Sequence, residues 1–378
     1  MSDISYLPFK VVAHPGELDS AVEDMACSRE VALDTESNSL HRYPEQLCLI
    51  QVATLQKIYL IDTITLDEIT LIKNILRDGS ITKVVHGADY DVRSLDRYGG
   101  FRIHGLYDTY IAARFAGLAK VGLADLLMDL LHIDIPKSKE IQHADWGRRP
   151  LSSEALDYAA ADVRHLLALK QILDLRLCSL GRAAWVSEEC LRVENVSYTP
   201  LNLDTAYLSI KGTQHLDGRA LAVLKSLFLF REAEARRQHR PPFFIIPDSA
   251  LVHLSNDPSA NLAEVPGLAH NLERIGPGTR QAIREGQNAA PIERPHVVYE
   301  PLNPGQLHIL TGLKFWRESL GQKLGLDPSL LWPTVSLERL AKAPDSFSAE
   351  VNSSNVREWQ RLEFSVSLET HLRARLKK

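Results

Sequence analysis

Three short apolar runs near the N-terminus, each bounded by polar residues, constrain the fold of this 378-residue chain most strongly. They span residues 30–36 (EVALDTE), 46–53 (QLCLIQVA) and 57–61 (KIYLI). Short apolar runs with brief polar connections are typical of consecutive antiparallel strands. A helical pattern at 66–77 and a strand-like run, ITKVVHG, come next, and helical patterns dominate residues 89–180. This order predicts an α/β domain with a mixed sheet and flanking helices.

The composition is that of an ordinary globular protein. Apolar residues make up 45% and charged residues 24%, which excludes wholesale disorder and fibrous structure. The chain has no uninterrupted apolar run of about 18 residues, and its N-terminus, MSDISYLPFK, lacks the basic and apolar parts of a signal peptide. Four cysteines without CxxC spacing predict neither a zinc site nor a disulfide framework. We therefore expect a soluble, cytoplasmic protein that does not enter a membrane.

Acidic residues are concentrated in the N-terminal part, where residues 1–211 hold 22 Lys and Arg against 30 Asp and Glu. Asp34 and Glu36 stand two positions apart at the end of the first apolar run, so both side chains leave a strand on the same face. Carboxylate oxygens gathered in this way suit a hard divalent cation such as Mg²⁺. The alternative is an exposed strand edge that carries two hydrated acids.

Two later segments also contain candidate acids. In HGADYDVRSL a strand ends at His86 and a helix begins near Asp89, so Asp89 is placed to cap the helix and Asp91 lies in its first turn. Spacing alone does not decide which of the two is a ligand, and both could be capping acids. In LDYAAADVRHLLAL, Tyr158 and Asp162 lie one helical turn apart on one face. An Asp162 that points inward needs a partner such as a metal; a surface Tyr–Asp pair is the alternative.

Taken together, these segments resemble the DEDD exonuclease superfamily, specifically its tyrosine-bearing branch, and most closely the RNase D family. The resemblance rests on ALDTES with YPEQLCLIQVAT, on KVVHGADYDVRSL, and on DWGRRPLS with LDYAAADVRHLL, and it covers roughly residues 20–180. It implies a ribonuclease H-like exonuclease domain over residues 1–205. It also implies two bound divalent ions, Mg²⁺ or Mn²⁺, with the ligands Asp34, Glu36, Asp91 and Asp162.

The resemblance also implies roles for individual residues. The family's second-motif acid falls at the fifth position after the histidine, which is Asp91 and not Asp89. In the family, one ion activates water and the other stabilises the leaving oxygen, as in other two-metal sites. Tyr158 is implied to hold the attacking water for in-line approach.

The C-terminal part is helical in pattern and contains an internal repeat. An offset of 86 aligns Phe230 with Trp316 and Arg231 with Arg317, and the alignment continues without a gap over some 25 residues. Residues 212–290 resemble an HRDC domain, the helical module that follows the exonuclease domain in RNase D. Residues 302–378 resemble it less well, because they have no equivalent of the IGPG turn. We expect two all-α HRDC-like domains joined by the proline-rich segment 289–301.

Several residues are candidates for contact with nucleic acid, because arginine binds phosphate and tryptophan can stack on a base. His86 and Gln51 lie near the motif strands, where a hydrogen-bonded structural role is the alternative. Solvated basic surface is the alternative for the arginines that end the first HRDC helix. The candidates with this predicted role are His86, Trp146, Arg148, Arg149, Arg231, Arg236, Arg237 and Arg240.

The resemblance therefore implies a 3′→5′ exoribonuclease that trims RNA 3′ ends, with transfer RNA precursors as the family's usual substrate. It implies no oligomer, so a monomer is favoured. A 3′→5′ DNA exonuclease of the Werner or proofreading type is the alternative, since both groups share the catalytic residues. A catalytically silent nucleic-acid-binding scaffold would require a missing ligand, and all four acids and the tyrosine are present.

Overall fold

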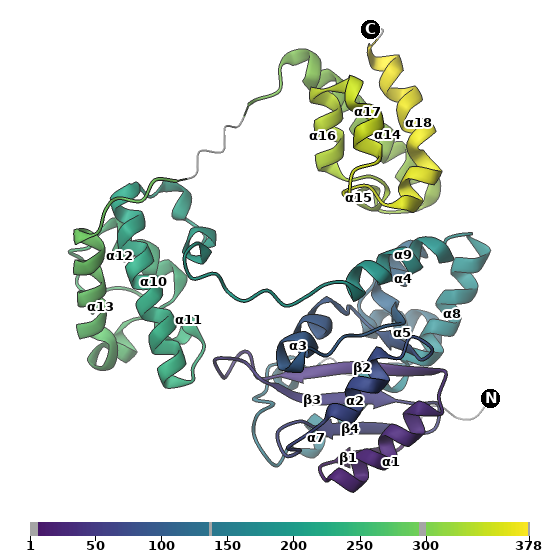
Figure 1. Cartoon of the computed structure of the whole chain (residues 1–378), viewed down its shortest axis with the longest axis horizontal. Coiled ribbons are helices and arrows are strands. Elements are labelled where there is room, and N and C mark those ends of the chain that lie inside the picture. Colours follow the sequence, from purple (N-terminus) through teal and green to yellow (C-terminus); the bar gives the residue numbers. More distant parts are fainter. Residues whose placement is uncertain (1–6, 136–137, 295–299, 377–378) are drawn as a thin grey trace.

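The computed structural model describes residues 7–135, 138–294 and 300–376, and in these ranges it contains one six-stranded sheet followed by helical modules (Figure 1). The strands lie in the order β1-β4-β3-β2-β5-β6. Their bounds are β1 (Phe9–Val12), β2 (Glu30–Ser37), β3 (Leu47–Ala53), β4 (Ile58–Asp62), β5 (Thr82–Val85) and β6 (Leu106–Asp108).

The centre of the sheet is the antiparallel meander that the apolar runs predict. β2 pairs with β3 and β3 with β4, and Gln51 stands opposite both Asp34 and Leu60 in the register. The remaining pairs, β1–β4, β2–β5 and β5–β6, are parallel, so the predicted mixed sheet is confirmed. β1 and β6 are missing from the prediction because runs of four and three residues are too short to show an alternating pattern.

Helices cover both faces of the sheet. One face packs against α1 (Pro15–Ala26), α2 (Thr70–Arg77) and α3 (Asp89–Gly99). The other packs against α4 (Thr109–Phe115), α5 (Leu123–Leu131), α7 (Ser153–Arg164), α8 (Leu166–Ser179) and α9 (Ala183–Glu194), with the short α6 (Lys139–Gln142) beside α7.

Side chains of β2 alternate between these two layers, as a strand requires. Leu33 is buried with the α1–α3 layer, and Ala32 is buried with the α7–α8 layer. By the same alternation, Asp34 and Glu36 lie on the α7 side, and Thr35 lies on the α3 side.

The C-terminal half is a duplicated helical frame, which confirms the internal repeat. Four helices of the first module begin 86 residues before their counterparts in the second, and Arg231 and Arg317 donate to the equivalent carbonyl oxygens of Ile246 (3.3 Å) and Trp332 (2.9 Å). The first module contains α10 (Gly218–Gln238), α11 (Pro242–Ile245), α12 (Asp248–Asn256) and α13 (Leu272–Asn288). The second contains α14 (Pro304–Leu324), α15 (Pro328–Leu331), α16 (Thr334–Lys342), α18 (Glu358–Leu376) and the additional α17 (Phe347–Val351).

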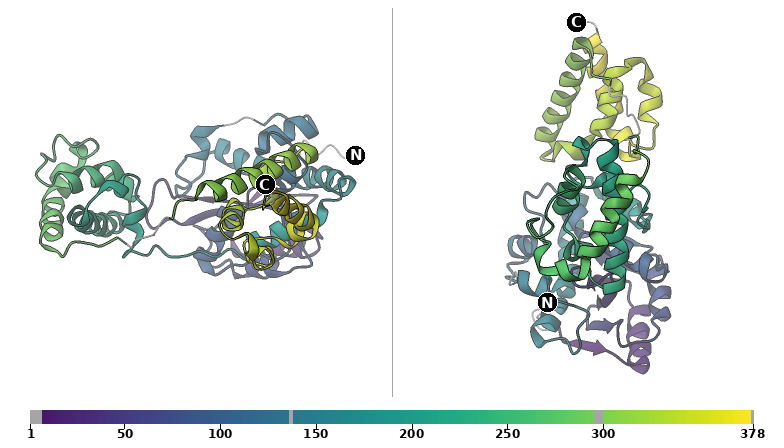
Figure 2. Two further views of the ribbon diagram at one scale, coloured as in Figure 1. Left: turned by 90° about the horizontal axis from the view of Figure 1, so that it is seen from above. Right: turned by 90° about the vertical axis from the view of Figure 1, so that its left-hand side faces the viewer.

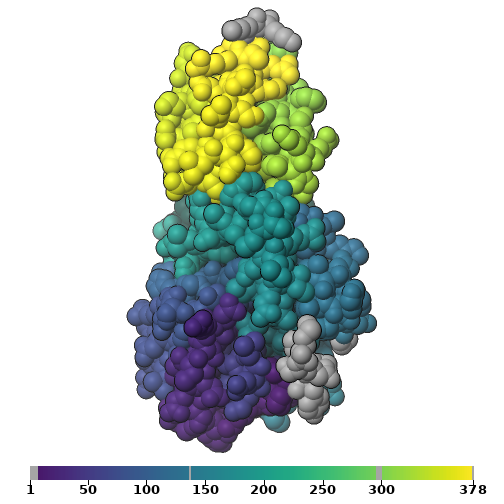
Figure 3. Space-filling view, turned by 90° about the vertical axis from the view of Figure 1, so that its right-hand side faces the viewer, coloured from purple at the N-terminus to yellow at the C-terminus, as the bar shows by residue number. Residues whose placement is uncertain are grey.

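The second module is docked firmly on the exonuclease domain (Figure 3). Trp359, at the start of α18, stacks on Trp185 of α9 with ring centroids 4.7 Å apart, and it is only 4% exposed. The Glu188 carboxylate accepts hydrogen bonds from the backbone N–H groups of Glu358 (2.7 Å) and Trp359 (2.9 Å). Burial of two large aromatic rings and satisfaction of a helix N-terminus stabilise this interface together.

The first module lies to one side of the exonuclease domain in Figure 1 and in the left view of Figure 2. The position equivalent to Trp359 is the exposed Glu273, so this module lacks the aromatic anchor of its copy. Its contact with the exonuclease domain is made through the β2–β3 loop, where the Tyr43 hydroxyl donates to Glu232 at 2.5 Å and Arg236 lies over the Tyr43 ring.

We predict that Trp359→Ala lowers the free energy of unfolding by about 3–5 kcal/mol, the usual cost of deleting a large buried aromatic side chain. Urea unfolding followed by far-UV circular dichroism measures the loss. Glu273→Ala, at the equivalent exposed position of the first module, is the matched control and should change stability by less than about 0.5 kcal/mol. Equal effects of the two substitutions would contradict the docking described here.

Candidate active site

Three of the four predicted acids converge. Ligand oxygens of Asp34, Glu36 and Asp162 all lie within 4.8 Å of one another. The approach is close because α7 packs across the sheet through the small buried side chains Ala159 and Ala160. The two acids from β2 and the one from α7 therefore face the same space.

Asp91 reaches the site from the other face of the sheet and lies outside that group of three. It is 5% exposed, and its Oδ1 accepts a 2.6 Å hydrogen bond from the Thr35 hydroxyl. Because Thr35 lies between Asp34 and Glu36, this bond fastens Asp91 to the strand that carries both acids. The prediction that Asp89 caps α3 is wrong: the N-cap is Ala88, and the exposed Asp89 forms an ion pair with Arg93 at 2.9 Å.

Burial and mutual repulsion favour the protonated forms of these acids. Burial, with Asp162 nearby, raises the pKa of Asp34 well above its usual value, and burial beside Asp34 does the same for the pKa of Asp91. Burial and then the neighbouring carboxylates raise the pKa of Glu36 to about 10. Burial raises the pKa of Asp162 to about 7, although its interaction with Tyr158 opposes the shift. A divalent cation is the partner that this all-oxygen donor set fits.

Tyr158 lies one turn before Asp162 on α7 and is half-buried beside the acids. Burial, and then the charges of the neighbouring carboxylates, raise its pKa above the usual value for tyrosine. The phenol therefore stays protonated at neutral pH and is available as a hydrogen-bond donor.

The site opens into a cavity of about 560 Å³. His86 lines it, and its Nδ1 lies 2.9 Å from the Thr109 hydroxyl. Burial lowers the pKa of His86 despite the nearby Asp108, so the imidazole is neutral near pH 7. Gln51 is fully buried and does not line this cavity. The other lining residues are Asp34, Thr35, Glu36, Ser37, Ser39, Leu40, Tyr90, Leu123, Gln142, His143, Ala144, Tyr158, Asp162 and Leu166.

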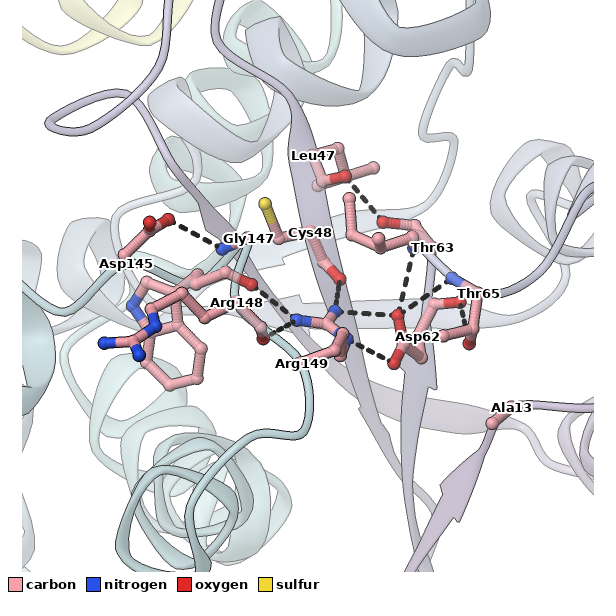
Figure 4. A network of polar contacts seen from close by, with 12 residues as sticks. Ala13, Leu47, Cys48, Asp62, Thr63, Thr65, Asp145, Gly147, Arg148 and Arg149 are labelled. Carbon is pink, nitrogen blue, oxygen red and sulfur yellow. Dashed lines mark hydrogen bonds and ion pairs between the residues drawn. The ribbon is translucent and has the colours of Figure 1, made fainter.

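The loop before α7 has mostly a packing role, contrary to what its sequence predicts. Trp146 is 1% exposed, so its ring is not available to stack on a base. The Arg149 guanidinium donates to both carboxylate oxygens of Asp62, at 2.5 and 2.7 Å, and to the Cys48 carbonyl at 2.9 Å (Figure 4). These bonds tie the loop to β3 and β4. Arg148 is exposed and points away from this network, so it stays a candidate for phosphate contact.

The candidate arginines in and just after α10 also fall into a buried group and an exposed group. Arg231 is 6% exposed and bonded to Asp248 at 2.5 Å, which gives it a packing role instead of the surface contact expected from the sequence. Arg236, Arg237 and Arg240 are exposed and remain candidates, although Arg237 forms an ion pair with Glu234. The helical periodicity of the sequence does not distinguish the buried arginine from the exposed ones. Arg231 is buried because of residues from other elements that pack around it, such as Asp248.

We predict that Asp162→Asn stabilises the metal-free protein at pH 8. The folded-state pKa of Asp162 is raised to about 7, so its ionisation removes stability as pH rises from the unfolded-state value, about 4, through that pKa. The gain should be about 1–3 kcal/mol at pH 8 and smaller at pH 5.

Thermal unfolding in excess chelator measures this gain at the two pH values. Adding Mg²⁺ at pH 8 should stabilise the unsubstituted protein more than the variant, so that the unsubstituted protein becomes the more stable of the two. A stability difference that does not change with pH would contradict the repulsion inferred for the site.

Among the helices in the described ranges, none combines the length and apolar character that crossing a membrane requires.

Known families match both parts of the chain. A 3′–5′ exonuclease family model matches residues 9–178, and an HRDC domain model matches residues 220–287. Ribonuclease D of Zymomonas mobilis is 32% identical over 295 residues, which cover 75% of this chain and 75% of that protein. Ribonuclease D of Desulfotalea psychrophila is 28% identical over 317 residues, covering 82% of this chain and 84% of the relative.

The fold has a counterpart among solved structures. The crystal structure of RNase D from Escherichia coli superposes with a TM-score of 0.70 at 23% identity, covering 97% of this chain and 99% of that chain. Sequence similarity along most of both ribonuclease D relatives, together with the two matching domain models, shows that this chain belongs to the ribonuclease D family.

Proposed function

We propose that the chain is a 3′→5′ exoribonuclease that hydrolyses phosphodiester bonds at RNA 3′ ends and uses two divalent ions, Mg²⁺ or Mn²⁺. The observation that carries the proposal is the convergence of Asp34, Glu36 and Asp162 at an open cavity in a member of this family. We assign Asp91 to the same ligand set because it is anchored next to these acids through Thr35.

The residues of the site have separate tasks. When bound, a pair of divalent ions supplies a deprotonated water and neutralises the charge that develops on the phosphate and the leaving oxygen. The four carboxylates hold those ions, and their raised pKa values mean that binding displaces protons. The neutral His86 at the cavity wall adds no charge that would compete with the ions.

The presence of Tyr158 supports the proposal that the site belongs to the tyrosine-bearing branch of the superfamily. Its protonated hydroxyl lies beside the acids at the cavity, where it can hold the attacking water in line with the scissile bond. A tyrosine with this role positions the water and does not bind the ion.

The natural substrate is proposed to be RNA with a free 3′ end, with transfer RNA precursors as the specific case, in the cytoplasm and with the protein as a monomer. The proposal divides the chain into an exonuclease domain (1–205), an HRDC domain (212–290) and a second HRDC-like domain (302–378). The exposed Arg148, Arg236, Arg237 and Arg240 are the proposed phosphate contacts.

We predict that Tyr158→Phe lowers kcat by about 10²-fold or more while the affinity for Mn²⁺ changes less than about twofold, because the hydroxyl positions water without holding the ion. Single-turnover cleavage of an end-labelled oligoribonucleotide and calorimetric Mn²⁺ titration measure the two quantities. Tyr90→Phe, at the same cavity, is the control and should retain activity. Near-normal hydrolysis by Tyr158→Phe would remove the tyrosine from the mechanism.

We predict that Asp34→Asn abolishes cleavage and weakens Mn²⁺ binding, because it removes a charged ligand from the converged acids. Asp89→Asn, an exposed acid on α3, is the control that should keep both properties. Matched RNA and DNA oligonucleotides with free or blocked 3′ ends test the substrate. Faster digestion of DNA would favour the DNA exonuclease alternative, and cleavage of blocked ends would overturn the 3′→5′ polarity.

A further inference from the structure

Asp108, at the end of β6, is a buried acid outside the proposed ligand set. It is 2% exposed, and its carboxylate accepts hydrogen bonds from four backbone N–H groups. Oδ1 accepts from Gly87 (2.9 Å), Tyr110 (2.8 Å) and Ile111 (3.4 Å), whereas Oδ2 accepts from Ala88 (2.9 Å). One side chain therefore joins the turn that enters α3 to the first turn of α4.

The neighbouring residue strengthens the same junction. Thr109 donates its hydroxyl to the Val85 carbonyl at 3.0 Å and lies 2.9 Å from His86 Nδ1. Val85 and Asp108 are partners in the β5–β6 register, so the end of β5, the turn after it and the start of α4 form one hydrogen-bonded frame.

This frame determines where α3 begins, and α3 carries Asp91 in its first turn. The N-cap of α3 is Ala88, which supplies no side-chain cap, so Asp108 provides the capping acceptor from a distant strand. The side chain of Asp91 is held separately by Thr35, whose hydroxyl donates to Asp91 Oδ1 at 2.6 Å. The Asp91 carboxylate is thus fixed from two directions.

We propose that Asp108, acting through α3, and Thr35, acting on the carboxylate itself, are the positioning residues that hold Asp91 at the edge of the ion site. The inference rests on the proposed function, because it takes Asp91 to be a ligand. Outer groups that orient a ligand typically contribute 10- to 100-fold in metal affinity or activity, so about that loss is expected when either is removed.

Asp108→Asn is the informative substitution because it acts on one side of the junction. The remaining carbonyl oxygen can still accept from Gly87 and α4, whereas the new amide donor would face the Ala88 N–H group. The start of α3 is then released while the cap on α4 is kept. A residue that only caps α4 would tolerate this change, since Asn and Asp are equally good N-caps.

The experiment uses the full-length protein and measures Mn²⁺ binding by calorimetry and cleavage of an oligoribonucleotide by steady-state kinetics. For Asp108→Asn and Thr35→Val we expect Mn²⁺ affinity and kcat to fall about 10-fold or more, with KM for the oligoribonucleotide within about twofold of its original value. Asp217→Ala, which removes the N-cap of α10 in the first helical module, is the control: it should cost stability and leave Mn²⁺ affinity unchanged.

Asp91→Asn distinguishes failure of this inference from failure of the proposed function. If Asp91→Asn weakens Mn²⁺ binding and the folded Asp108→Asn and Thr35→Val variants bind Mn²⁺ as tightly as the original protein, the positioning role is overturned. If Asp91→Asn itself has no effect, the assignment of Asp91 as a ligand fails first, and the inference fails with it. If Asp108→Asn does not fold, Asp108→Glu replaces it, because it keeps both acceptor oxygens on a longer side chain. The same loss of Mn²⁺ affinity and kcat is expected for Asp108→Glu.

Discussion

Repulsion among buried carboxylates is the constraint on which the rest of the structure depends. Asp34, Glu36 and Asp162 are held within 4.8 Å of one another, and such an arrangement opposes folding once the acids are ionised. The apolar core that the strand meander shares with α7 and α8 supplies the stability that offsets this cost. The fold therefore keeps the three acids close together, and this prepares a place for cations.

The sequence predicts the parts of the molecule whose pattern is local. The meander follows from three apolar runs, and the shared face of Asp34 and Glu36 follows from strand alternation. Features that depend on contacts between residues far apart in the sequence cannot be predicted from local patterns. The sequence makes Trp146 and Arg149 candidates for nucleic-acid contact. In the structure, Trp146 is buried and the Arg149 guanidinium is engaged by Asp62 of β4. Likewise, spacing places Asp91 in a helix but does not show that it arrives from the opposite face of the sheet.

The duplicated modules show how one helical frame supports two different roles. Their helices keep the 86-residue offset and the same arginine-to-carbonyl bond, so the internal packing is shared. The surfaces have diverged: Trp359 docks on α9, whereas the equivalent Glu273 remains in solvent. The same helical frame thus supports one module that docks on α9 and one that contacts the exonuclease domain through the β2–β3 loop.

The docking of α18 on α9 also restricts how the first module can move. Because the second module is anchored to the exonuclease domain, the first is joined to that domain on both sides, through residues 195–205 and through the second module. A doubly tethered module samples a small volume around its attachment points. A ligand held by a module tethered in this way stays near the exonuclease domain, at an effective concentration of about millimolar for short connections.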